Sequence, residues 1–424
     1  MIIRFSVENF RSIRDRQELT MVASSLKDQS ESLIPIEQVG IDLVPVAAIY
    51  GANASGKTNV VQALNYMCQA VASSHRNWQP DKPIPRPAFA LDDSPHRPSS
   101  FEIEFVVSQV RYQYGFSLDD LKIQEEWLYA YPNGKKQRWY ARVETPARKF
   151  VFGRNLLGDK NRTIEALTRT NSLYLSAAAQ NNHELLLPIY NFFANDIRFS
   201  FGKGPALETS NMCSDDKQRA VLLRYLEAAD LGIAGVRVED MKLEAPLEKA
   251  MSAFISALRE VTPQSEVTIP KLVQPLFQHR AIGESRIEFG QENESGGTMA
   301  YFSLLAPVLK ALDRGGVLCV DELDASLHPL LALEIVRNFT EKKLNPQGAQ
   351  LIFNTHDTNL LDSSLLRRDQ VWFTEKDSSG STHLYPLSDF RPRKDENLKR
   401  GYLQGRYGAI PFIDRDMLPQ ETSD

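Results

Sequence analysis

Apolar positions early in the chain change from strand spacing to helical spacing at a glycine-rich turn. Residues 2–9 alternate between apolar and polar side chains, and Val44–Tyr50 is a short apolar strand that ends at a glycine. Apolar side chains then recur at helical spacing over roughly Lys57–Ala72. The stretch Trp78–Ser99 is rich in proline, aspartate and serine, so we expect a loop there.

The middle of the chain first shows strand patterns and then turns mainly helical. Strand-like runs fill Phe101–Phe152, where Asn133-Gly134 indicates a hairpin turn. Helical spacing dominates from about Ile164 to Leu258. The rest alternates helices with buried strands: a helix at about Met299–Leu312, a strand at Val317–Val320, a helix at Pro329–Lys342, a strand at Gln350–Asn354 and a strand pair within 370–390.

Apolar strands flanked by helices predict an α/β fold, with a parallel or mixed sheet and helices on both faces. The strands of the middle region predict an additional β-rich arm, and the helical stretch predicts an insertion. We expect three domains: an N-terminal lobe at 1–160, a mainly helical insertion at 161–290 and a C-terminal lobe at 291–424. The two halves of the main sheet are thus separated in sequence.

The bulk composition is that of an ordinary globular protein, with 42% hydrophobic and 24% charged residues. The formal net charge of −5 argues against a surface that coats nucleic acid, so any such contact must be a local patch. Cys68, Cys213 and Cys319 lie far apart without metal-ligand spacing, which indicates free thiols. Without an apolar run long enough to cross a membrane, and with charges early in the chain, we expect a cytoplasmic protein.

The glycine-rich turn Gly51–Thr58, GANASGKT, matches the P-loop pattern GxxxxGK[ST]. Its glycines allow the backbone N–H groups to point at phosphates, Lys57 would reach the β- and γ-phosphates, and the Thr58 hydroxyl would help to hold Mg²⁺. The alternative is a glycine-rich turn without function, but a predicted strand precedes the motif and a helix follows it, as the mechanism requires. The expected ATP contacts in this loop are Gly51, Asn53, Ala54, Ser55, Gly56, Lys57 and Thr58.

Two acids follow the apolar strand Val317–Val320. A strand buried on both faces places carboxylates at its carboxyl end, beside the phosphates of a bound nucleotide. Asp321 is therefore a candidate Mg²⁺ ligand, and Glu322 is a candidate base that would orient or deprotonate the attacking water. The alternative is a core strand that runs into a charged helix cap.

A glycine pair and a serine lie shortly before that strand, at the start of a predicted helix. Ser295, Gly296 and Gly297 would form an anion site, and they resemble the SGG core of the LSGGQ signature of ABC proteins. This resemblance implies that the motif contacts the γ-phosphate held by a second subunit, so that ATP lies between two copies. Residues 323–329, LDASLHP, look like the D-loop that crosses the dimer interface, with Asp324 as its candidate contact.

Two further segments fit the same comparison. His356, in Asn354-Thr-His-Asp357, lies where ABC ATPases carry the switch histidine that contacts the γ-phosphate. The opening Ile3–Ser12 resembles that of RecF, SMC and OLD-type ATPases, and Arg11 or Ser12 is then a candidate phosphate contact; a plain edge strand is the alternative. The Mg²⁺-binding glutamine of ABC ATPases stays unassigned, since Gln109 and Gln113 fall within strand-like sequence.

The order of these motifs resembles the ABC-type ATPases of the SMC/RecF/OLD group. The run 367–377, RRDQVWFTEKD, and the tail 401–412, GYLQGRYGAIPF, further resemble a prokaryotic anti-phage subgroup that includes RloA, the AbiL ATPases and the ATPase subunit of the PARIS system. The resemblance implies an ATPase that acts with ATP and Mg²⁺, as a homodimer or a higher oligomer of dimers. It also implies a sensor or scaffold of toxin–antitoxin-like abortive infection, which controls a Toprim-type or other nuclease after a phage trigger.

A possible nuclease site near the end of the chain lacks one of its parts. Asp414 and Asp416 form a DxD-like pair, but no strand with a glutamate precedes them as in a Toprim domain, so we predict no nuclease site in this chain.

The competing hypothesis for the function is a DNA-repair ATPase that binds DNA directly. It would use two basic stretches, one with interleaved aromatic residues: Lys135, Lys136, Arg138, Trp139, Tyr140, Arg142, Arg148 and Lys149, and, near the end, Arg391, Arg393, Lys394, Lys399 and Arg400.

Overall fold

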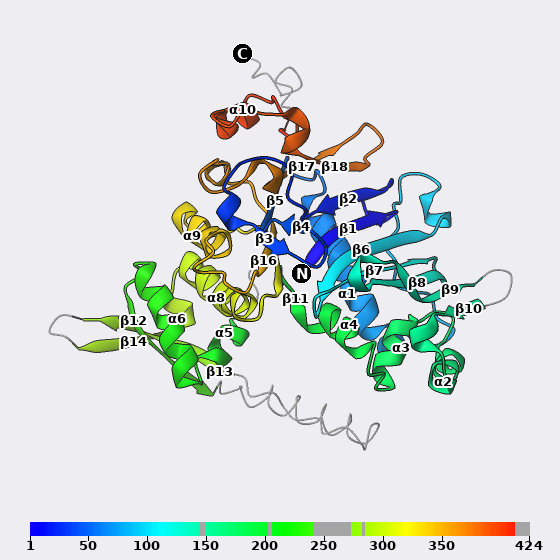
Figure 1. Ribbon diagram of the computed structural model, residues 1–424. Helices are drawn as coiled ribbons and strands as arrows, with labels where there is room; N and C mark the ends of the chain where they lie inside the picture. The colour runs from blue at the N-terminus through cyan, green and yellow to red at the C-terminus, as the bar shows by residue number, and fades with distance from the viewer. Residues whose placement is uncertain (145–148, 202–205, 241–272, 282–284, 412–424) are drawn as a thin grey trace, which may run out of the picture. The chain divides into compact units, whose positions relative to one another are not determined.

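The computed structural model of the chain describes residues 1–144, 149–201, 206–240, 273–281 and 285–411 (Figure 1). The chain divides into two compact units. The larger unit consists of Met1–Gly202, Lys310–Asp324 and Ala332–Asp424, and the smaller unit of Lys203–Leu309 and Ala325–Leu331. Among the described helices, none combines the length and the apolar character that crossing a bilayer would need.

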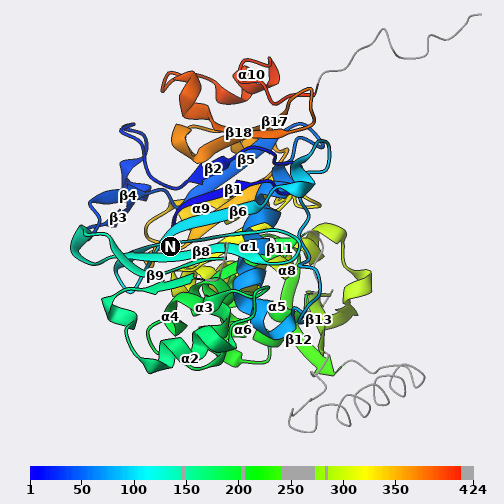
Figure 2. The same cartoon turned by 90° about the vertical axis from the view of Figure 1, so that its right-hand side faces the viewer.

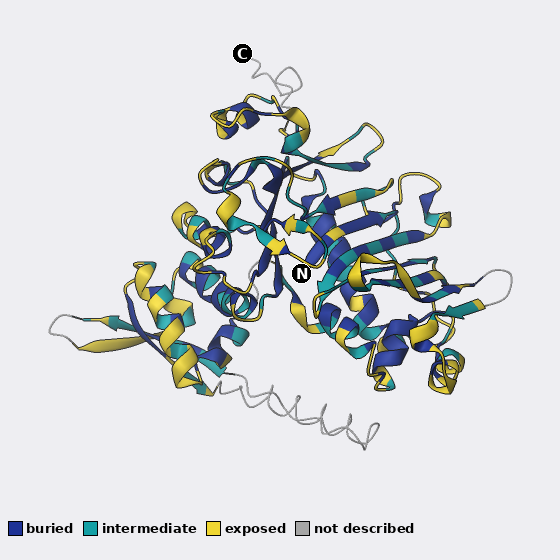
Figure 3. Cartoon of the chain, viewed as in Figure 1, coloured by how far each residue is buried: buried dark blue, intermediate teal, exposed yellow. Residues whose placement is uncertain are grey.

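A six-stranded sheet forms one layer of the larger unit. All neighbouring strands are parallel except the last pair, so the carboxyl ends of five strands meet at one edge. The strands at its centre are buried throughout, which explains their unbroken apolar sequence (Figure 3). In spatial order the sheet contains β11 (Ile197–Phe201), β15 (Val317–Asp321), β16 (Gln350–Asn354), β5 (Val46–Gly51), β17 (Val371–Lys376) and β18 (Thr382–Pro386).

A seven-stranded antiparallel sheet forms a second layer. The strands predicted within 101–152 are confirmed, and they continue the sheet that the N-terminal strand begins. Its strands, in spatial order, are β10 (Lys149–Phe152), β9 (Gln137–Val143), β8 (Ile123–Tyr131), β7 (Val110–Leu118), β6 (Ser99–Val107), β1 (Ile2–Glu8) and β2 (Gln17–Thr20). A separate short pair consists of β3 (Ile34–Ile36) and β4 (Ile41–Leu43).

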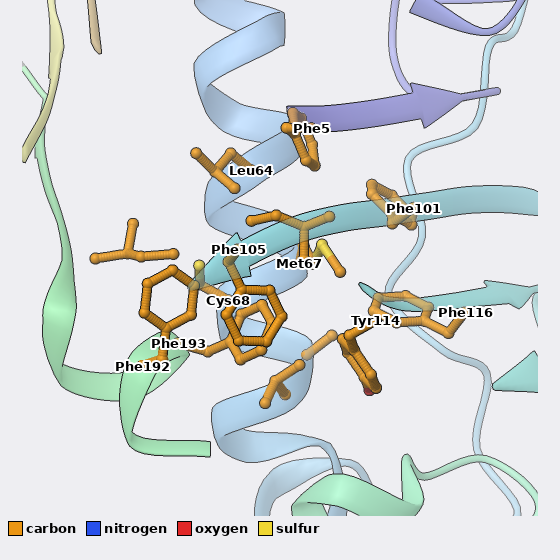
Figure 4. Packing of buried hydrophobic residues seen from close by; sticks show 14 of the residues in the cluster. Phe5, Leu64, Met67, Cys68, Phe101, Phe105, Tyr114, Phe116, Phe192 and Phe193 are labelled. Atoms are coloured by element: carbon orange, nitrogen blue, oxygen red, sulfur yellow. The ribbon is translucent and has the colours of Figure 1, made fainter. Parts of the chain in front are cut away.

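Helix α1 (Lys57–Asn77) lies between these two layers (Figure 2). Leu64, Met67 and Cys68 of this helix pack among phenylalanines of the antiparallel sheet, such as Phe105 (Figure 4). The same hydrophobic cluster includes Ile49 of the parallel sheet. Each fully buried side chain of this size contributes about 1.5–3 kcal/mol, so packing on both faces fixes the direction of α1 and of the loop before it.

The remaining helices of the larger unit are short. They are α2 (Asp159–Leu167), α3 (Tyr174–Gln180), α4 (Leu187–Asn191) and α10 (Leu398–Leu403), and most of α9 (Pro329–Thr340) belongs to this unit as well. The smaller unit contains an antiparallel sheet of β12 (Ile233–Asp240), β13 (Val273–Arg280) and β14 (Arg286–Gly290), with α5 (Leu207–Met212), α6 (Asp216–Ala228) and most of α8 (Gly296–Arg314).

The compact units do not follow the predicted domain boundaries at 160 and 290. Strand β11 lies within the predicted helical insertion, yet it pairs in parallel with β15, Phe201 opposite Asp321. Helices α2, α3 and α4 also belong to the larger unit. Ile197, Phe199 and Phe201 alternate with polar residues as in a strand, but the sequence does not show that the partner is β15.

Part of one predicted basic stretch is buried in the core, although Lys135, Lys136, Arg138 and Lys149 of the same stretch are exposed. Arg142 is 1% exposed, Trp139 is 9% exposed and Tyr140 is fully buried. Arg142 donates to the carbonyl oxygen of Ser172 (2.7 Å) and pairs with Glu144 at 3.3 Å. The prediction that these three side chains form part of a DNA-binding surface is therefore wrong. Alternation places Tyr140 and Arg142 on the same face of β9, and the pairing of β9 with β8 shifts register at Trp139, which is buried as well.

Glu126 is the buried acid at the centre of this region. Its carboxylate lies 3.9 Å from the Arg142 guanidinium and accepts hydrogen bonds from the hydroxyls of Tyr114 and Tyr140. It also accepts the backbone N–H groups that begin α3, those of Tyr174 (2.6 Å) and Leu175 (3.0 Å). The buried charge thus has partners on each side, and it ties the antiparallel sheet to α3.

Replacing Arg142 by alanine is expected to lower the free energy of unfolding by about 3–5 kcal/mol, because it leaves a buried carboxylate uncompensated. Urea denaturation would measure the loss. Arg138→Ala is the matched control, since Arg138 is exposed on the same strand, and it should stay within about 0.5 kcal/mol of the unchanged protein. Equal midpoints for the two variants would contradict a structural role for Arg142.

Candidate nucleotide-binding site

The loop Gly51–Thr58 connects β5 to α1 at the edge where the parallel strands end. It forms one wall of a pocket of about 500 Å³. The residues that line the pocket are Asn53, Ala54, Gly56, Lys57, Thr58, Asn59, Glu322, His356 and Lys376. The pocket therefore brings together four segments that are far apart in sequence, at the edge where parallel sheets bind ligands.

Lys57 lies folded against its own loop. Its ammonium donates to the carbonyl oxygens of Gly51 (2.9 Å) and Ala52 (3.0 Å). Burial lowers the pKa of Lys57, while the carboxylates of Asp324 and Glu322 act in the opposite direction. A partly desolvated ammonium held at the start of a helix is well suited to bind phosphate.

Gly56 precedes α1 in a conformation that suits glycine, with φ of 107°. A Cβ atom there would overlap the Thr382 side chain of β18. The Thr382 hydroxyl donates to the Ser55 carbonyl (2.9 Å), and the hydroxyls of Ser55 and Thr374 lie 2.6 Å apart. The hairpin of β17 and β18 thus holds the P-loop from behind.

The predicted metal ligands lie side by side. The Thr58 hydroxyl donates to Asp321 Oδ1 at 2.9 Å. A hydroxyl and a carboxylate suit a hard cation such as Mg²⁺, which takes few protein ligands and keeps oxygens of water and phosphate. Within the described ranges, no cluster of three or more histidine, cysteine, aspartate or glutamate side chains could hold a metal by itself.

Asn354 is a buried residue of this site that sequence reasoning missed. Its side-chain amide donates to Asp321, and its oxygen accepts the Glu322 backbone N–H at 2.6 Å. Glu322 adopts a left-handed backbone with φ of 56°, which is uncommon outside glycine. Asn354 thereby fixes both acids. The sequence feature that could have identified Asn354 is its position at the end of a buried strand, directly before Thr355-His356.

His356 lies at the same edge of the parallel sheet, two residues after Asn354. Its backbone N–H faces the Asp324 carboxylate at 3.3 Å, and its side chain lines the pocket with Glu322. Burial lowers the pKa of His356, and the nearby Lys57 lowers it further. A largely neutral imidazole at neutral pH can donate or accept a hydrogen bond.

Arg11 and Ser12 do not line this pocket. The Ser12 hydroxyl accepts from the Asn59 amide (2.6 Å) and lies 2.7 Å from the Thr382 hydroxyl, so it supports the start of α1. Arg11 has a left-handed backbone, with φ of 50°, and its guanidinium lies 5.8 Å from the Phe10 ring centroid. It lines a second pocket, of about 370 Å³. Phosphate contacts by these two residues stay predictions.

The predicted signature lies in the smaller unit. Ser295 caps α8, because its hydroxyl accepts the Thr298 backbone N–H at 3.0 Å, and Gly296 begins that helix. A Cβ at Gly297 would lie 2.9 Å from the carbonyl oxygen of Ser326, a residue of the predicted D-loop in the same unit. Glycine is therefore needed where the two motifs meet.

Other predicted residues lie elsewhere. Gln109 is in the turn between β6 and β7, and Gln113 bonds to Glu102 and Tyr131 on the antiparallel sheet, so neither lines the pocket. Asp414 and Asp416 lie outside the described residues.

Comparison with known proteins gives a family and two similar structures. Residues 46–362 match the family described as AAA domain, putative AbiEii toxin, Type IV TA system. The chain is similar to the Smc head bound to the C-winged helix domain of ScpA, with 12% identity, a TM-score of 0.40, and coverage of 91% of this chain and 96% of that chain. It is also similar to the Smc head domain with an extended coiled coil, bound to the C-terminal domain of ScpA derived from Pyrococcus furiosus. That comparison gives 12% identity, a TM-score of 0.37, and coverage of 92% of this chain and 97% of that chain. No curated protein matches the chain.

The tight packing behind Gly56 leads to a paired prediction. Gly56→Ala should abolish binding of a fluorescent nucleoside triphosphate, because the new methyl group displaces the P-loop from Thr382. Gly134→Ala is the matched control, since Gly134 also has positive φ (73°) but has nothing within 4 Å of a Cβ. It should cost about 1–2 kcal/mol of unfolding free energy and leave binding intact. Retained binding by Gly56→Ala would refute the steric argument.

Proposed function

This chain belongs to the family described as AAA domain, putative AbiEii toxin, Type IV TA system, and on that premise we propose that it binds ATP with Mg²⁺ and hydrolyses it. The observation that carries the proposal is the contact between the Thr58 hydroxyl and Asp321 (2.9 Å) beside a pocket that Thr58 lines together with Lys57, Glu322 and His356. These are the side chains that positioning, charge neutralisation and water activation require in phosphoryl transfer.

Each group has a distinct task in this mechanism. The P-loop N–H groups and Lys57 bind the phosphates, and Thr58 and Asp321 would hold Mg²⁺, which neutralises charge on the phosphate oxygens. Glu322, held by Asn354 through its backbone, orients the attacking water and accepts its proton. His356, which lines the pocket with Glu322, would hydrogen-bond the γ-phosphate.

Glu322→Gln should retain ATP binding and lower turnover by about 100-fold or more, because the amide cannot accept the proton. Phosphate release would measure turnover, and ATP binding would be measured separately. Glu341→Gln, at an exposed glutamate outside the pocket, is the control and should behave as the unchanged protein. Wild-type turnover by Glu322→Gln would show that another group activates the water.

We further propose that two copies complete each ATP site. The P-loop lies in the larger unit, and the signature Ser295–Gly297 lies in the smaller one. In a two-fold dimer the signature and D-loop of one copy would face the ATP held by the other, with Asp324 near the crossing point. ATP would then close the dimer, and hydrolysis would open it.

Complementation between two inactive variants tests this arrangement. Lys57→Ala damages the P-loop, and Ser295→Arg damages the signature. A mixed dimer keeps one complete site, so an equimolar mixture should recover about a quarter of wild-type turnover if dimers form at random with independent sites. Light scattering of Glu322→Gln with ATP would confirm the dimer mass. Mixed dimers without recovered turnover would place each site within one chain.

The biological role we propose is a sensor or scaffold subunit of an abortive-infection system that controls a partner effector, such as a nuclease. The support is the family description together with the resemblance of 367–377 and of the tail to anti-phage ATPases. Because no nuclease motif is predicted in the chain, the damaging step would belong to the partner.

Phage challenge of cells that carry the chain with its flanking genes tests this role. Protection should be lost by at least tenfold in plaque count with Glu322→Gln and retained with Glu341→Gln. Equal protection by both variants would show that defence does not require ATP hydrolysis. If the unchanged genes give no protection, the proposed role in abortive infection is wrong.

A further inference from the structure

Lys376 is a second lysine in the P-loop pocket, and no sequence motif assigns it a role. It is the last residue of β17, which pairs in parallel with the P-loop strand β5, Thr374 opposite Gly51. Because strand side chains alternate, Lys376 lies on the same face of β17 as Thr374, whose hydroxyl contacts Ser55 of the P-loop. The register of the sheet thus aims Lys376 at the phosphate loop.

The turn after Lys376 is held by its own hydrogen bonds. The Asp377 carboxylate accepts from the backbone N–H groups of Ser379 (2.8 Å) and Ser381 (3.0 Å) and from His383 (3.0 Å). The hydrogen bond from His383 is the largest of the effects that hold the pKa of Asp377 well below its usual range. A fixed carboxylate orders the turn, so the position of Lys376 is restricted at its Cα.

The ammonium of Lys376 is available for a ligand. Its side chain is exposed, and no carboxylate of the described residues lies within ion-pairing distance of it. Glu375, its neighbour on the opposite face, bonds instead to Tyr385 (3.2 Å). Lys376 therefore adds positive charge to a pocket whose lining includes Lys57 and a single carboxylate, that of Glu322.

From this geometry we propose that Lys376 binds the phosphate chain of the nucleotide from the side opposite Glu322, as a contact supplied by the same chain. The inference rests on the proposed ATP site and adds a residue to it. A lysine ammonium makes charge-assisted hydrogen bonds to phosphate oxygens as a point charge, and Mg²⁺ with Lys57 leaves part of the triphosphate charge uncompensated.

Equilibrium binding of ATP, and its displacement by inorganic tripolyphosphate, test the contact. Lys376→Ala should lower the affinity for both ATP and tripolyphosphate by roughly tenfold or more, as expected for the loss of one charge-assisted hydrogen bond. Lys376→Arg should restore most of the affinity, because the charge returns. Lys135→Ala removes an exposed lysine outside the pocket and should bind as the unchanged protein. The urea midpoints of these variants should agree, since both lysines are exposed.

The outcomes separate this inference from the function it rests on. If Lys57→Ala loses both ligands and Lys376→Ala binds normally, Lys376 is a solvated side chain and only this inference fails. If Lys376→Ala weakens ATP and leaves tripolyphosphate unchanged, the side chain contacts the nucleoside, and the proposal is overturned. If the unchanged protein binds neither ligand, the proposed ATP site itself fails.

Discussion

The parallel pairing of β5 between β16 and β17 is the constraint on which the candidate site depends. It sets Ile49 opposite Asn354 and Gly51 opposite Thr374, so that three strands end together around one loop. Because all of β5 is buried, a slip by one residue would turn its side chains to the wrong faces of the sheet. The apolar core and the backbone pairing of these strands therefore fix the position of the polar site.

Behind the loop, the same edge of the sheet contains a chain of hydroxyl groups. Ser12, Ser55, Thr374 and Thr382 are linked to one another or to the P-loop backbone by hydrogen bonds of 2.6–2.9 Å. Buried hydroxyls cost free energy unless they are paired, and here each finds a partner on a different segment. The P-loop is thus held by polar contacts that a slightly displaced loop could not make, which explains why the hairpin of β17 and β18 accompanies it.

The sequence predicted the groups that carry local motifs and missed those that depend on pairing. Lys57, Thr58, Asp321 and His356 follow recognisable patterns, and the structure brings them to one pocket or to its edge. Asn354 and Lys376 end ordinary strands, and their roles depend on which strands become neighbours. Arg142 was wrongly predicted to lie on the surface, because it belongs to a basic stretch of the sequence. In the fold its strand directs it into the core, beside Glu126. Strand β11 was missed within a stretch of helical spacing, although Ile197, Phe199 and Phe201 alternate, and its partner lies more than a hundred residues away in sequence.

The C-terminal segment packs against the strand that supports the P-loop. Phe373 is fully buried on β17, next to Thr374, and its ring packs against those of Tyr402 (5.5 Å) and Tyr407 (5.8 Å). Gly401 leaves room for the Tyr407 ring, which a Cβ would approach to 2.7–2.9 Å. Consecutive residues of one strand therefore contact the P-loop on one face and the tail on the other. Tyr402 and Tyr407 of the tail thus cover the strand that supports the P-loop, and Gly401 makes room for them.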